Sequence, residues 1–404
     1  MGRGHTCDSQ DTADCMILLV DANNFYVACE RIFRPDLQHK PVLVLSNPNG
    51  CVIARSSCVK GLGIPMGVPF KQVQKLCCDH HVTCFNANHT LYQNISSRMM
   101  KLLSAFDPQL DVYSIDEAFI QSHTPESTAK AIQAMIDQCL GIKVSVGSGS
   151  TKTLAKLANH IAKKHTVNGL FHDVNRDWLK KTDIQDVWGI GSRYTQKLKQ
   201  NGLFTAFDLQ ASCSTMIKQL LGTTGLRVYH ELRGMSCYGR TQTRTLSITR
   251  SAAFAQHTDD RGEIEAALLY HLRRATQALH QAKKVCRTIE LIWTEQPYCH
   301  KRITINLPYA TDQIHTLLTQ AKGALQQTPP ATYRKIGIIL HHLSDKSEQL
   351  PIDPMQTMIE QVQQKFGQNS LCWATEAYGH RWQKSTHQRS PNYLSCWQSL
   401  YAVS

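Results

Sequence analysis

Residues 110–121 read LDVYSIDEAFIQ, two short apolar runs on either side of Asp116 and Glu117. Alternating apolar and polar residues around a polar centre predict a β-hairpin with the acidic pair between its strands. A second apolar run, Met16–Asp21, also ends on a carboxylate. An ionised carboxylate among buried apolar residues is costly unless a cation or a hydrogen-bond donor satisfies it. The hairpin and this strand are therefore the first candidates for a functional site.

The segments around the hairpin alternate between helix and strand. His89–Ala105 and Ala129–Leu140 have apolar residues at helical spacing, and Lys143–Gly149 has the pattern of a strand. Together with Met16–Asp21 and the hairpin they give the order strand–helix–strand–strand–helix–strand. The simplest fold for that order is a split β-α-β unit of the ferredoxin type, which predicts an α+β protein. Residues 25–88 interrupt the order and are expected to form an inserted lobe.

A second unit with the same order of elements is predicted in the C-terminal half. No pair of carboxylates stands at the end of a strand in this unit, which indicates a binding module. Its expected strands are Thr245–Phe254, Val285–Trp293, Arg302–Leu307 and Lys335–Leu340, and its expected helices are Thr258–Lys283 and Ile314–Leu325.

The charge of the chain indicates a polyanionic partner. The 404 residues include 44 Lys and Arg against 31 Asp and Glu, a net charge of +13. Residues 177–250 hold 11 of the basic and 5 of the acidic residues, so nearly half of the excess lies there. Such a concentration is typical of nucleic-acid binding. Apolar runs such as Met16–Val20 are far shorter than the ~20 residues of a membrane-spanning helix, which excludes an integral membrane protein.

The N-terminus and the cysteines indicate a cytoplasmic protein. Residues 1–15 are polar where a signal peptide needs an apolar core, and we expect them to form a disordered extension. The 15 cysteines are then expected to be reduced thiols. A zinc site remains an alternative for one cluster, although no second ligand pair follows it at finger-like spacing; the cluster contains Cys77, Cys78, His80, His81 and Cys84.

The basic segment contains a candidate phosphate-binding hairpin. Residues 187–191 read VWGIG and precede a helical pattern. Two glycines around one apolar residue let the backbone turn tightly and direct N–H groups at a phosphate. We expect a helix-hairpin-helix that binds the DNA backbone without reading bases. The alternative is a plain glycine turn. The candidate DNA contacts are Gly189, Gly191, Arg193, Lys197 and Lys199.

The three carboxylates suit a magnesium site. The first and third strands of a ferredoxin-like sheet are neighbours, so Asp21 can face Asp116 and Glu117. Oxygen ligands of this kind suit Mg²⁺, which keeps several waters and shares its shell with a substrate phosphate. Two such ions can stabilise the attacking and leaving oxygens of an in-line phosphoryl displacement. The alternative is that Asp116 and Glu117 only form a polar hairpin tip.

Several motifs in the same order resemble the Y-family translesion DNA polymerases. A further run, KPVLVLSNPNGCVIARSSCVKGLGIPMG at residues 40–67, is similar to the UmuC branch, the catalytic subunit of bacterial DNA polymerase V. The resemblance covers residues 16–343 and extends more loosely through Ser390–Tyr393. The motifs that carry it are DANNFY at 21–26, SIDEAF at 114–119, VSVGSGSTKTLAKLAN at 144–159 and VWGIGSRYTQKL at 187–198.

The resemblance implies a right-hand polymerase. It would have a ferredoxin-like palm, small fingers, a helical thumb with the helix-hairpin-helix, and a β-α-β-β-α-β little finger. The implied palm is residues 16–24 and 86–176, the fingers 25–85, the thumb 177–240, the little finger 245–343, and a tail for docking partners 344–404.

The resemblance also implies roles for single residues. Asp21, Asp116 and Glu117 match metal-binding catalytic carboxylates, and the backbone carbonyl of Ala22 matches a further metal ligand. Tyr26 matches the steric gate, an aromatic ring under the incoming sugar that excludes a 2′-hydroxyl. Phe25 belongs to the same sugar-facing turn.

Three basic residues are implied to bind the triphosphate of the nucleotide. Lys163 matches a lysine with this role, and Arg55 and Lys60 are the other candidates. Lys152, Lys156 and Lys163 are spaced by four and seven residues, so at about 100° per residue they share one helix face. The alternative is a stripe of solvated lysines.

The implied activity is error-prone, template-dependent synthesis past DNA lesions in the SOS response, with Mg²⁺ as the cofactor. Its substrates would be primer–template DNA and dNTP. Its partners would be a UmuD′-type accessory dimer, RecA and a sliding clamp, with Gln349, Leu350 and Ile352 as the candidate clamp peptide. Two alternatives are a palm-fold nucleotide cyclase, which would not need the basic segment 177–250, and a non-catalytic DNA-binding scaffold, which would not need the carboxylates.

Overall fold

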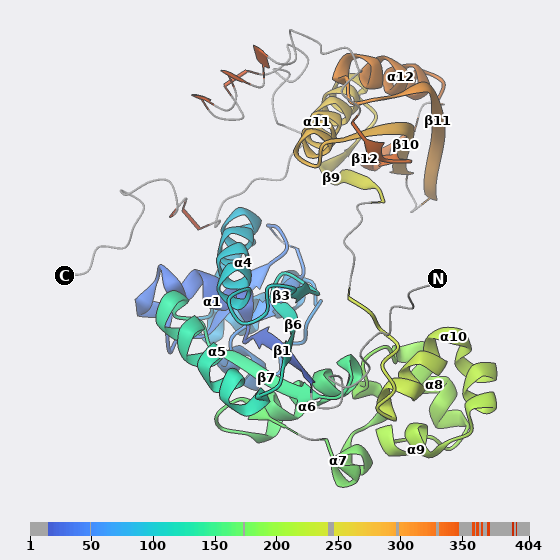
Figure 1. The fold of residues 1–404 in the computed structure, drawn as a ribbon. Helices are drawn as coiled ribbons and strands as arrows, with labels where there is room; N and C mark the ends of the chain where they lie inside the picture. The colour runs from blue at the N-terminus through green and yellow to red at the C-terminus, as the bar shows by residue number, and fades with distance from the viewer. Residues whose placement is uncertain are drawn as a thin grey trace, which may run out of the picture. The chain divides into compact units, whose positions relative to one another are not determined.

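The computed structural model forms two units, residues 1–242 with 386–404, and residues 243–385 (Figure 1). Most of residues 15–346 are described. The exceptions are 49, 173, 241–245, 296–298 and 329–330; beyond 346 only 358–359, 361–362, 365–366, 370–371, 390–391 and 393 are described. The expected N-terminal extension up to residue 14 and the candidate clamp peptide Gln349, Leu350 and Ile352 lie outside the described residues.

The first unit is built on a five-stranded sheet with the strand order β5-β6-β1-β7-β8. Strand β1 is antiparallel to β6 on one side and to β7 on the other. Without β8, this is the order of a ferredoxin-like sheet. The strands are β1 (Met16–Ala22), β5 (Asp111–Val112), β6 (Glu117–Ser122), β7 (Val144–Gly149) and β8 (Leu170–Phe171).

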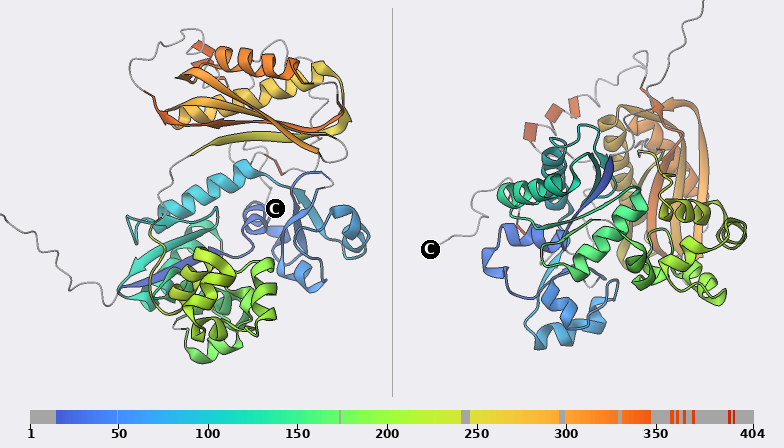
Figure 2. Two further views of the ribbon diagram at one scale, coloured as in Figure 1. Left: turned by 90° about the vertical axis from the view of Figure 1, so that its right-hand side faces the viewer. Right: turned by 60° about the horizontal axis from the view of Figure 1, so that its bottom comes forward.

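Helices cover both faces of this sheet, α4 (His89–Leu103) and α5 (Pro125–Leu140) on one and α6 (Lys152–His165) on the other (Figures 1 and 2). Side chains of a strand alternate between the faces of a sheet. In β1, Leu18 and Val20 accordingly lie in the core with α4 and α5, whereas Leu19 packs against α6. Both faces of the sheet are thus buried, and its strand ends remain available for polar groups.

Close contacts hold helix α6 against the sheet. The side chain of Thr151 accepts a hydrogen bond from the Leu154 N–H and caps the helix. A Cβ at Gly147 of β7 would lie 2.0 Å from the backbone nitrogen of Asn159, so only glycine allows this approach. Asn159 Nδ2 donates to the carbonyls of Leu19 (3.3 Å) and Ser145 (2.8 Å). These contacts determine where the lysines of α6 lie.

The inserted lobe has a small sheet and core of its own. Strand order is β3-β2-β4. Its elements are α1 (Phe25–Ile32), a 3₁₀ turn (Pro35–Leu37), β2 (Val42–Leu45), β3 (Val52–Arg55), α2 (Ser57–Gly61), α3 (Phe70–Asp79) and β4 (Thr83–Asn86). Cys77 is buried in this core and Cys78 is exposed. Within the described part of the chain, no three His, Cys, Asp or Glu side chains are grouped to hold a metal ion.

A helical segment follows and packs on α6. Its elements are α7 (Arg176–Lys181), a 3₁₀ turn (Ile184–Asp186), α8 (Ser192–Gln200), α9 (Ala206–Ala211) and α10 (Ser214–Leu232). Leu157 and Ile161 of α6 belong to its core. The fully buried carboxylate of Glu231 accepts backbone N–H groups of Thr153 at 3.0 Å and Cys237 at 2.6 Å. A buried charge with several donors ties the end of α10 to the start of α6.

The second unit has the predicted order of elements but a different strand order from the first. The sheet runs β11-β10-β12-β9, with every pair antiparallel. Helices α11 and α12 lie on one face (Figure 2). The elements are β9 (Ile248–Thr258), α11 (Arg261–Gln281), β10 (Lys284–Glu295), β11 (Cys299–Thr311), α12 (Ile314–Gln326), β12 (Tyr333–His341) and β13 (Ser344–Asp345), which pairs with β10.

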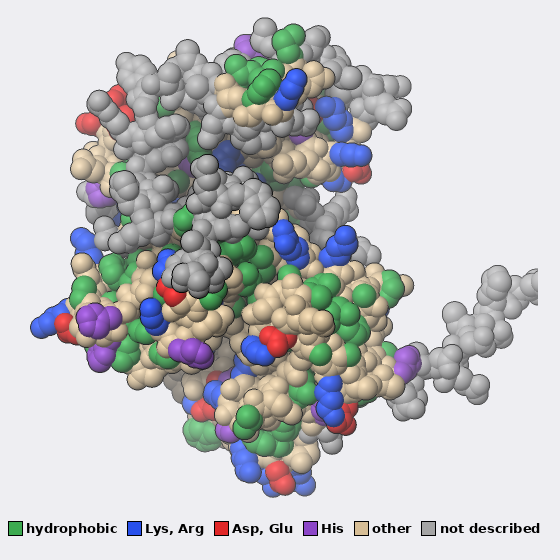
Figure 3. Space-filling model, turned by 90° about the vertical axis from the view of Figure 1, so that its left-hand side faces the viewer, with side chains coloured by type: hydrophobic (Ala, Val, Ile, Leu, Met, Phe, Trp, Pro, Cys, Tyr) green, Lys and Arg blue, Asp and Glu red, His purple; other side chains and the backbone are tan. Residues whose placement is uncertain are grey.

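Two surface properties bear on the sequence predictions. Among the helices of the described residues, none combines the length and the apolar character that crossing a membrane would require. On the face in Figure 3, Lys and Arg side chains are scattered among Asp and Glu and do not form one basic patch. The net positive charge is therefore not gathered on that face.

Candidate active site

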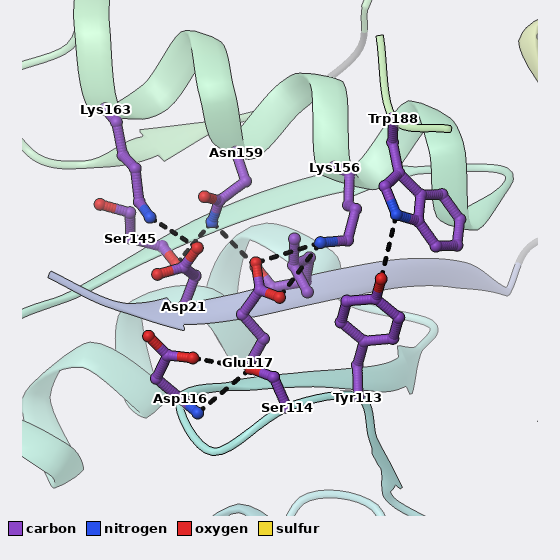
Figure 4. A network of polar contacts seen from close by, with 11 residues as sticks. Asp21, Tyr113, Ser114, Asp116, Glu117, Ser145, Lys156, Asn159, Lys163 and Trp188 are labelled. Atoms are coloured by element: carbon purple, nitrogen blue, oxygen red, sulfur yellow. Dashed lines mark hydrogen bonds and ion pairs between the residues drawn. The ribbon is translucent and has the colours of Figure 1, made fainter. Parts of the chain in front are cut away.

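The three predicted carboxylates meet at one end of the β1–β6 pair (Figure 4). Asp21 and Glu117 are directly paired across the two strands. The N–H of Ala22 donates to the carbonyl oxygen of Asp116 at 3.0 Å, which joins the strand end to the hairpin turn. Ser114 Oγ donates to Asp116 Oδ1 at 2.6 Å. The register of the sheet therefore brings together residues that are about a hundred positions apart in the chain.

Two lysines of α6 neutralise two of these carboxylates. Lys163 Nζ lies 2.5 Å from Asp21 Oδ2. Lys156 Nζ lies 3.1 Å from both carboxylate oxygens of Glu117. Lys152, on the same helix face, is buried and pairs with Asp111 instead. The lysine stripe is thus not a solvated surface, because each of its members contacts an acid of the sheet.

Burial perturbs the ionisation of Asp21. Burial raises the pKa of Asp21 to about 7, Lys163 opposes this increase, and Glu117 adds to it by repulsion. A carboxylate with a raised pKa is poorly stabilised as an anion, and a nearby cation relieves that cost. The pair Asp21–Glu117 is therefore a place where positive charge is favoured.

The donor set fits a divalent metal ion. Asp21, Asp116 and Glu117 supply the hard oxygen ligands that Mg²⁺ prefers, and burial raises the pKa of Asp21 even though Lys163 lies beside it. Within the described part of the chain, however, no three His, Cys, Asp or Glu side chains are grouped so that they could hold a metal ion, and these three carboxylates are no exception. The ammonium groups of Lys156 and Lys163 carry the compensating charge in this structure.

Tyr26 lies on α1, directly after the strand that carries Asp21. The chain turns at Asn24, which has a left-handed backbone (φ 51°, ψ 46°), and α1 begins at Phe25. The ring of Tyr26 is half-buried and stacks on Tyr92 of α4, with ring centroids 4.4 Å apart and an interplanar angle of 15°. Phe25 lies on the same turn and its side chain is buried in the main core; its place beside the sugar stays a prediction.

The predicted triphosphate contacts lie close enough to affect one another. The side chain of Lys60 is exposed, yet its pKa is lowered, first by desolvation and then by repulsion from Arg55 and Lys163, while Asp21 acts in the opposite direction. Arg55 is anchored by a hydrogen bond to the carbonyl of Ile64. Lys60 is therefore repelled by two further cations, and an anion bound beside it would relieve that repulsion.

The glycines of the VWGIG hairpin differ in their requirements. Gly189 has a positive φ of 90°, and a Cβ there would lie 2.9 Å from Val228 Cγ2. Gly191 has an ordinary extended backbone (φ −83°) with open space around it, and it precedes α8. The expectation that both positions need glycine for the turn is therefore wrong for Gly191.

The basic residues of this hairpin are also not equivalent. Arg193 and Lys197 are exposed on α8, one turn apart. Lys199 pairs with Asp183 at 2.9 Å and is only half-exposed. Of the three candidate phosphate contacts, Arg193 and Lys197 are the two whose charge is directed to solvent.

One group near the site is absent from the sequence predictions. The indole of Trp188 donates to the hydroxyl of Tyr113 at 3.2 Å (Figure 4). Lys156 Nζ lies over both rings, 4.3 Å from the centre of Tyr113 and 5.4 Å from that of Trp188. The hairpin that precedes α8 therefore contacts the lysine that neutralises Glu117. Trp188 lies within the motif at 187–198 and Tyr113 directly precedes the motif at 114–119, but only the fold brings the two motifs together.

The sequence matches known families over most of its length. Residues 20–160 match the impB/mucB/samB family, and residues 245–352 match the C-terminal domain of that family. Residues 354–403 match a family described only as a domain of unknown function.

Curated relatives match over nearly the whole chain. Protein UmuC of Salmonella typhimurium is 30% identical, covering 96% of this chain and 100% of the relative. Protein ImpB of Salmonella typhimurium is also 30% identical, covering 95% of this chain and 99% of the relative. A DNA polymerase IV of Dehalococcoides mccartyi is 27% identical, covering 88% and 96%.

Solved structures share the fold. The Y-family DNA polymerase chimera Dbh-Dpo4(243-245)-Dbh superposes with a TM-score of 0.67 at 20% identity, covering 82% of this chain and 99% of that chain. An insertion ternary complex of Dbh DNA polymerase has a TM-score of 0.59, also at 20% identity and with the same coverage. These similarities confirm the predicted α+β fold class.

Proposed function

The chain belongs to the impB/mucB/samB family of Y-family DNA polymerases, and from this we propose that Asp21, Asp116 and Glu117 form its catalytic site. The family resemblance predicted from the motifs is confirmed, and the protein is an error-prone DNA polymerase of the translesion type. The proposal concerns how this chain's own residues carry out that activity.

The carboxylates would hold Mg²⁺, with the backbone carbonyl of Ala22 as a further ligand. When bound, the ions stabilise charge on the attacking 3′-oxygen of the primer and on the leaving pyrophosphate. The pairing of Asp21 with Lys163 and the raised pKa of Asp21 support this assignment, because they mark a site that favours cations. Lys163 would exchange its partner from Asp21 to the triphosphate of the incoming nucleotide.

The nucleotide would lie between the carboxylates and the cations of the inserted lobe. Arg55, Lys60 and Lys163 interact electrostatically beside Asp21, which supports their role as triphosphate ligands. Tyr26, half-buried on the turn after β1, would exclude a 2′-hydroxyl with its ring. Phe25, on the same turn, would lie beside the sugar.

We assign the parts of the chain as the family resemblance predicts. The palm would be residues 16–24 and 86–176, and the fingers 25–85. The thumb (177–240) would bind the DNA backbone through the hairpin at Gly189, with Arg193 and Lys197 as phosphate contacts. The little finger would be 245–343, and residues 344–404 the tail.

The partners and location remain predictions from the same resemblance. They are a UmuD′-type accessory dimer, RecA, a sliding clamp and the cytoplasm. Membership in a family of DNA polymerases favours polymerisation over the nucleotide cyclase.

One observation carries the proposal most directly: Asp21, Asp116 and Glu117 adjoin one another beside three cations. A primer-extension assay with all four dNTPs tests it, on one undamaged template and one that contains a single abasic site. With Mg²⁺ we expect templated extension on the first and continued extension past the lesion on the second, and with a chelator we expect neither. Binding of primer–template without extension would instead indicate a scaffold, and consumption of dNTP without a primer would indicate a cyclase.

A further inference from the structure

Two residues near the C-terminus are packed into the first unit. Tyr393 is only 7% exposed and belongs to the same core as the central sheet. Its ring is stacked on Phe33, with centroids 4.8 Å apart and an interplanar angle of 5°. Tyr393 lies in the segment 354–403, which matches a domain of unknown function. Part of that segment therefore packs against the core of the first unit.

Ser390 contacts a buried carboxylate next to this stack. Its Oγ donates to Glu30 Oε1 at 3.2 Å and accepts from Asn88 Nδ2 at 3.0 Å. Glu30 is fully buried on α1. A buried carboxylate depends on donors from the protein, since water cannot supply them. Ser390 is one of these donors, although it lies 360 positions away in the chain.

The same carboxylate leads to the candidate steric gate. The hydroxyl of Tyr92 donates to Glu30 Oε1 at 2.7 Å, and the ring of Tyr92 is the one on which Tyr26 stacks. Asn88, the other partner of Ser390, caps the N-terminus of α4 by accepting from the Leu91 N–H at 3.3 Å. Ser390 therefore bridges the two helices that hold Tyr26, α1 through Glu30 and α4 through Asn88.

We propose that Ser390 and Tyr393 form an intramolecular clasp that holds α1 against α4, and that Ser390 is a positioning residue for Tyr26. Tyr393 anchors the clasp through its stack on Phe33, and Ser390 acts through Glu30 and Tyr92. The effect on sugar selection rests on the proposed function of Tyr26, whereas the clasp itself does not. The clasp would give part of the C-terminal domain a structural role, which is to hold in place the two helices that position Tyr26.

The effect of Ser390 on sugar selection depends on small displacements of the Tyr92 and Tyr26 rings. Without Ser390, Glu30 Oε1 keeps Tyr92 as a donor but loses the donor from Ser390 in a place that water does not reach, so the carboxylate is held less firmly. Tyr92 shares that oxygen, so its ring moves with the carboxylate, and the ring of Tyr26 moves with that of Tyr92. Exclusion of a single hydroxyl group requires the ring position to be accurate within about 1 Å.

Full-length variants test the clasp in two ways. The variants are Ser390→Ala, Tyr393→Ala and Tyr393→Phe, with Phe366→Ala as the matched control, because Phe366 is an exposed aromatic residue of the same tail. The first measurement is hydrogen exchange of the α1 and α4 amides in the DNA-free protein. The second is the ratio of ribonucleotide to deoxyribonucleotide incorporation, with Tyr26→Ala as the upper reference.

We expect Ser390→Ala and Tyr393→Ala to speed exchange in α1 and α4. We also expect both to raise the incorporation ratio about tenfold, the size of effect of one hydrogen bond to a charged group. Tyr393→Phe keeps the stacked ring and loses only the contact between its hydroxyl and Arg34, so it should stay nearer to wild type than Tyr393→Ala; Phe366→Ala should stay near wild type.

Unchanged exchange in both alanine variants would overturn the clasp. Faster exchange with an unchanged incorporation ratio would overturn the positioning role, because the contact would then be merely structural. If the wild-type protein incorporates no nucleotide, the proposed function fails, and the exchange comparison alone decides whether the clasp exists.

Discussion

At the scale of single residues, Asp312 shows how the second unit satisfies a buried carboxylate. Asp312 Oδ2 lies 2.7 Å from Lys346 Nζ and 3.3 Å from His280 Nε2. Burial would raise the pKa of Asp312, but the hydrogen bonds from His280 and Lys346 outweigh it and lower the pKa to about 2. The folded state therefore binds a proton at Asp312 less readily than the unfolded chain does.

This shift predicts a pH-dependent contribution to stability. Because the pKa of Asp312 is lower in the folded state, its contribution is complete above the unfolded value of 3.8 and is lost as the pH falls toward about 2. Asp312→Asn should lower the free energy of unfolding of the second unit by about 2 kcal/mol at pH 7, and by less at pH 3. Urea unfolding at the two pH values measures this difference.

As the matched control, Asp345→Asn removes an acid that is 88% exposed in its pair with Lys284, and it should lower the free energy of unfolding by less than about 1 kcal/mol. A decrease in stability for Asp312→Asn that is equal at both pH values would contradict the assigned cause.

Single residues also show the limit of prediction from the sequence. Asp21, Asp116 and Glu117 could be found because an ionised carboxylate at the end of an apolar strand is costly unless a cation or a hydrogen-bond donor satisfies it. The partners of the α6 lysines could not be found, because Lys152 and Lys156 share a helix face yet pair with Asp111 and Glu117 respectively. Helical spacing determines which side chains share a face, and only the packed sheet determines what that face meets.

At the scale of elements, two strands differ in length from the prediction, because backbone hydrogen bonds determine where a strand ends and the pattern of side chains does not show them. The first strand of the predicted hairpin is short: β5 has only two residues, because the N–H groups of Tyr113 and Ser114 both donate to the carbonyl of Glu117 in the turn. The edge strand β11 is longer than predicted, and most of its extra residues are exposed. Periodicity indicates the type of an element but not its neighbours, so the strand order of the second sheet could not be predicted.

The hairpin before α8 makes the clearest prediction for an element. Replacing Arg193 and Lys197 with alanine should reduce the slope of log affinity against log salt for primer–template DNA, by up to ~0.9 for each phosphate that the protein no longer neutralises. The reduction should be the same on two unrelated duplexes, because interactions with the DNA backbone carry no base information. Lys199→Ala is the matched control and should keep the wild-type slope, since Lys199 pairs with Asp183. Equal slopes for the double variant and the wild type would show that this helix does not touch the DNA backbone.

At the scale of the whole molecule, the candidate chemistry lies entirely in the first unit. Contacts from segments far apart in the chain converge there: the cations of the inserted lobe and α6, the hairpin through Trp188, and the C-terminal residues Ser390 and Tyr393. The family motifs predicted most of these parts from the sequence. The contact between Ser390 and Glu30 could not be predicted, because the two residues are 360 positions apart in the chain and meet only in the folded protein.

The central claim is that Asp116 and Glu117 act in the chemical step and not in DNA binding. Single-turnover extension of a primer bound at saturating enzyme, with Mg²⁺ and the correct dNTP, measures that step directly. Asp116→Asn and Glu117→Gln should each slow it ~100-fold or more while primer–template affinity changes little. Glu126→Gln, which removes an exposed carboxylate of α5 in an ion pair with Lys130, is the control and should extend at the wild-type rate. Extension near the wild-type rate by either active-site variant would contradict the account.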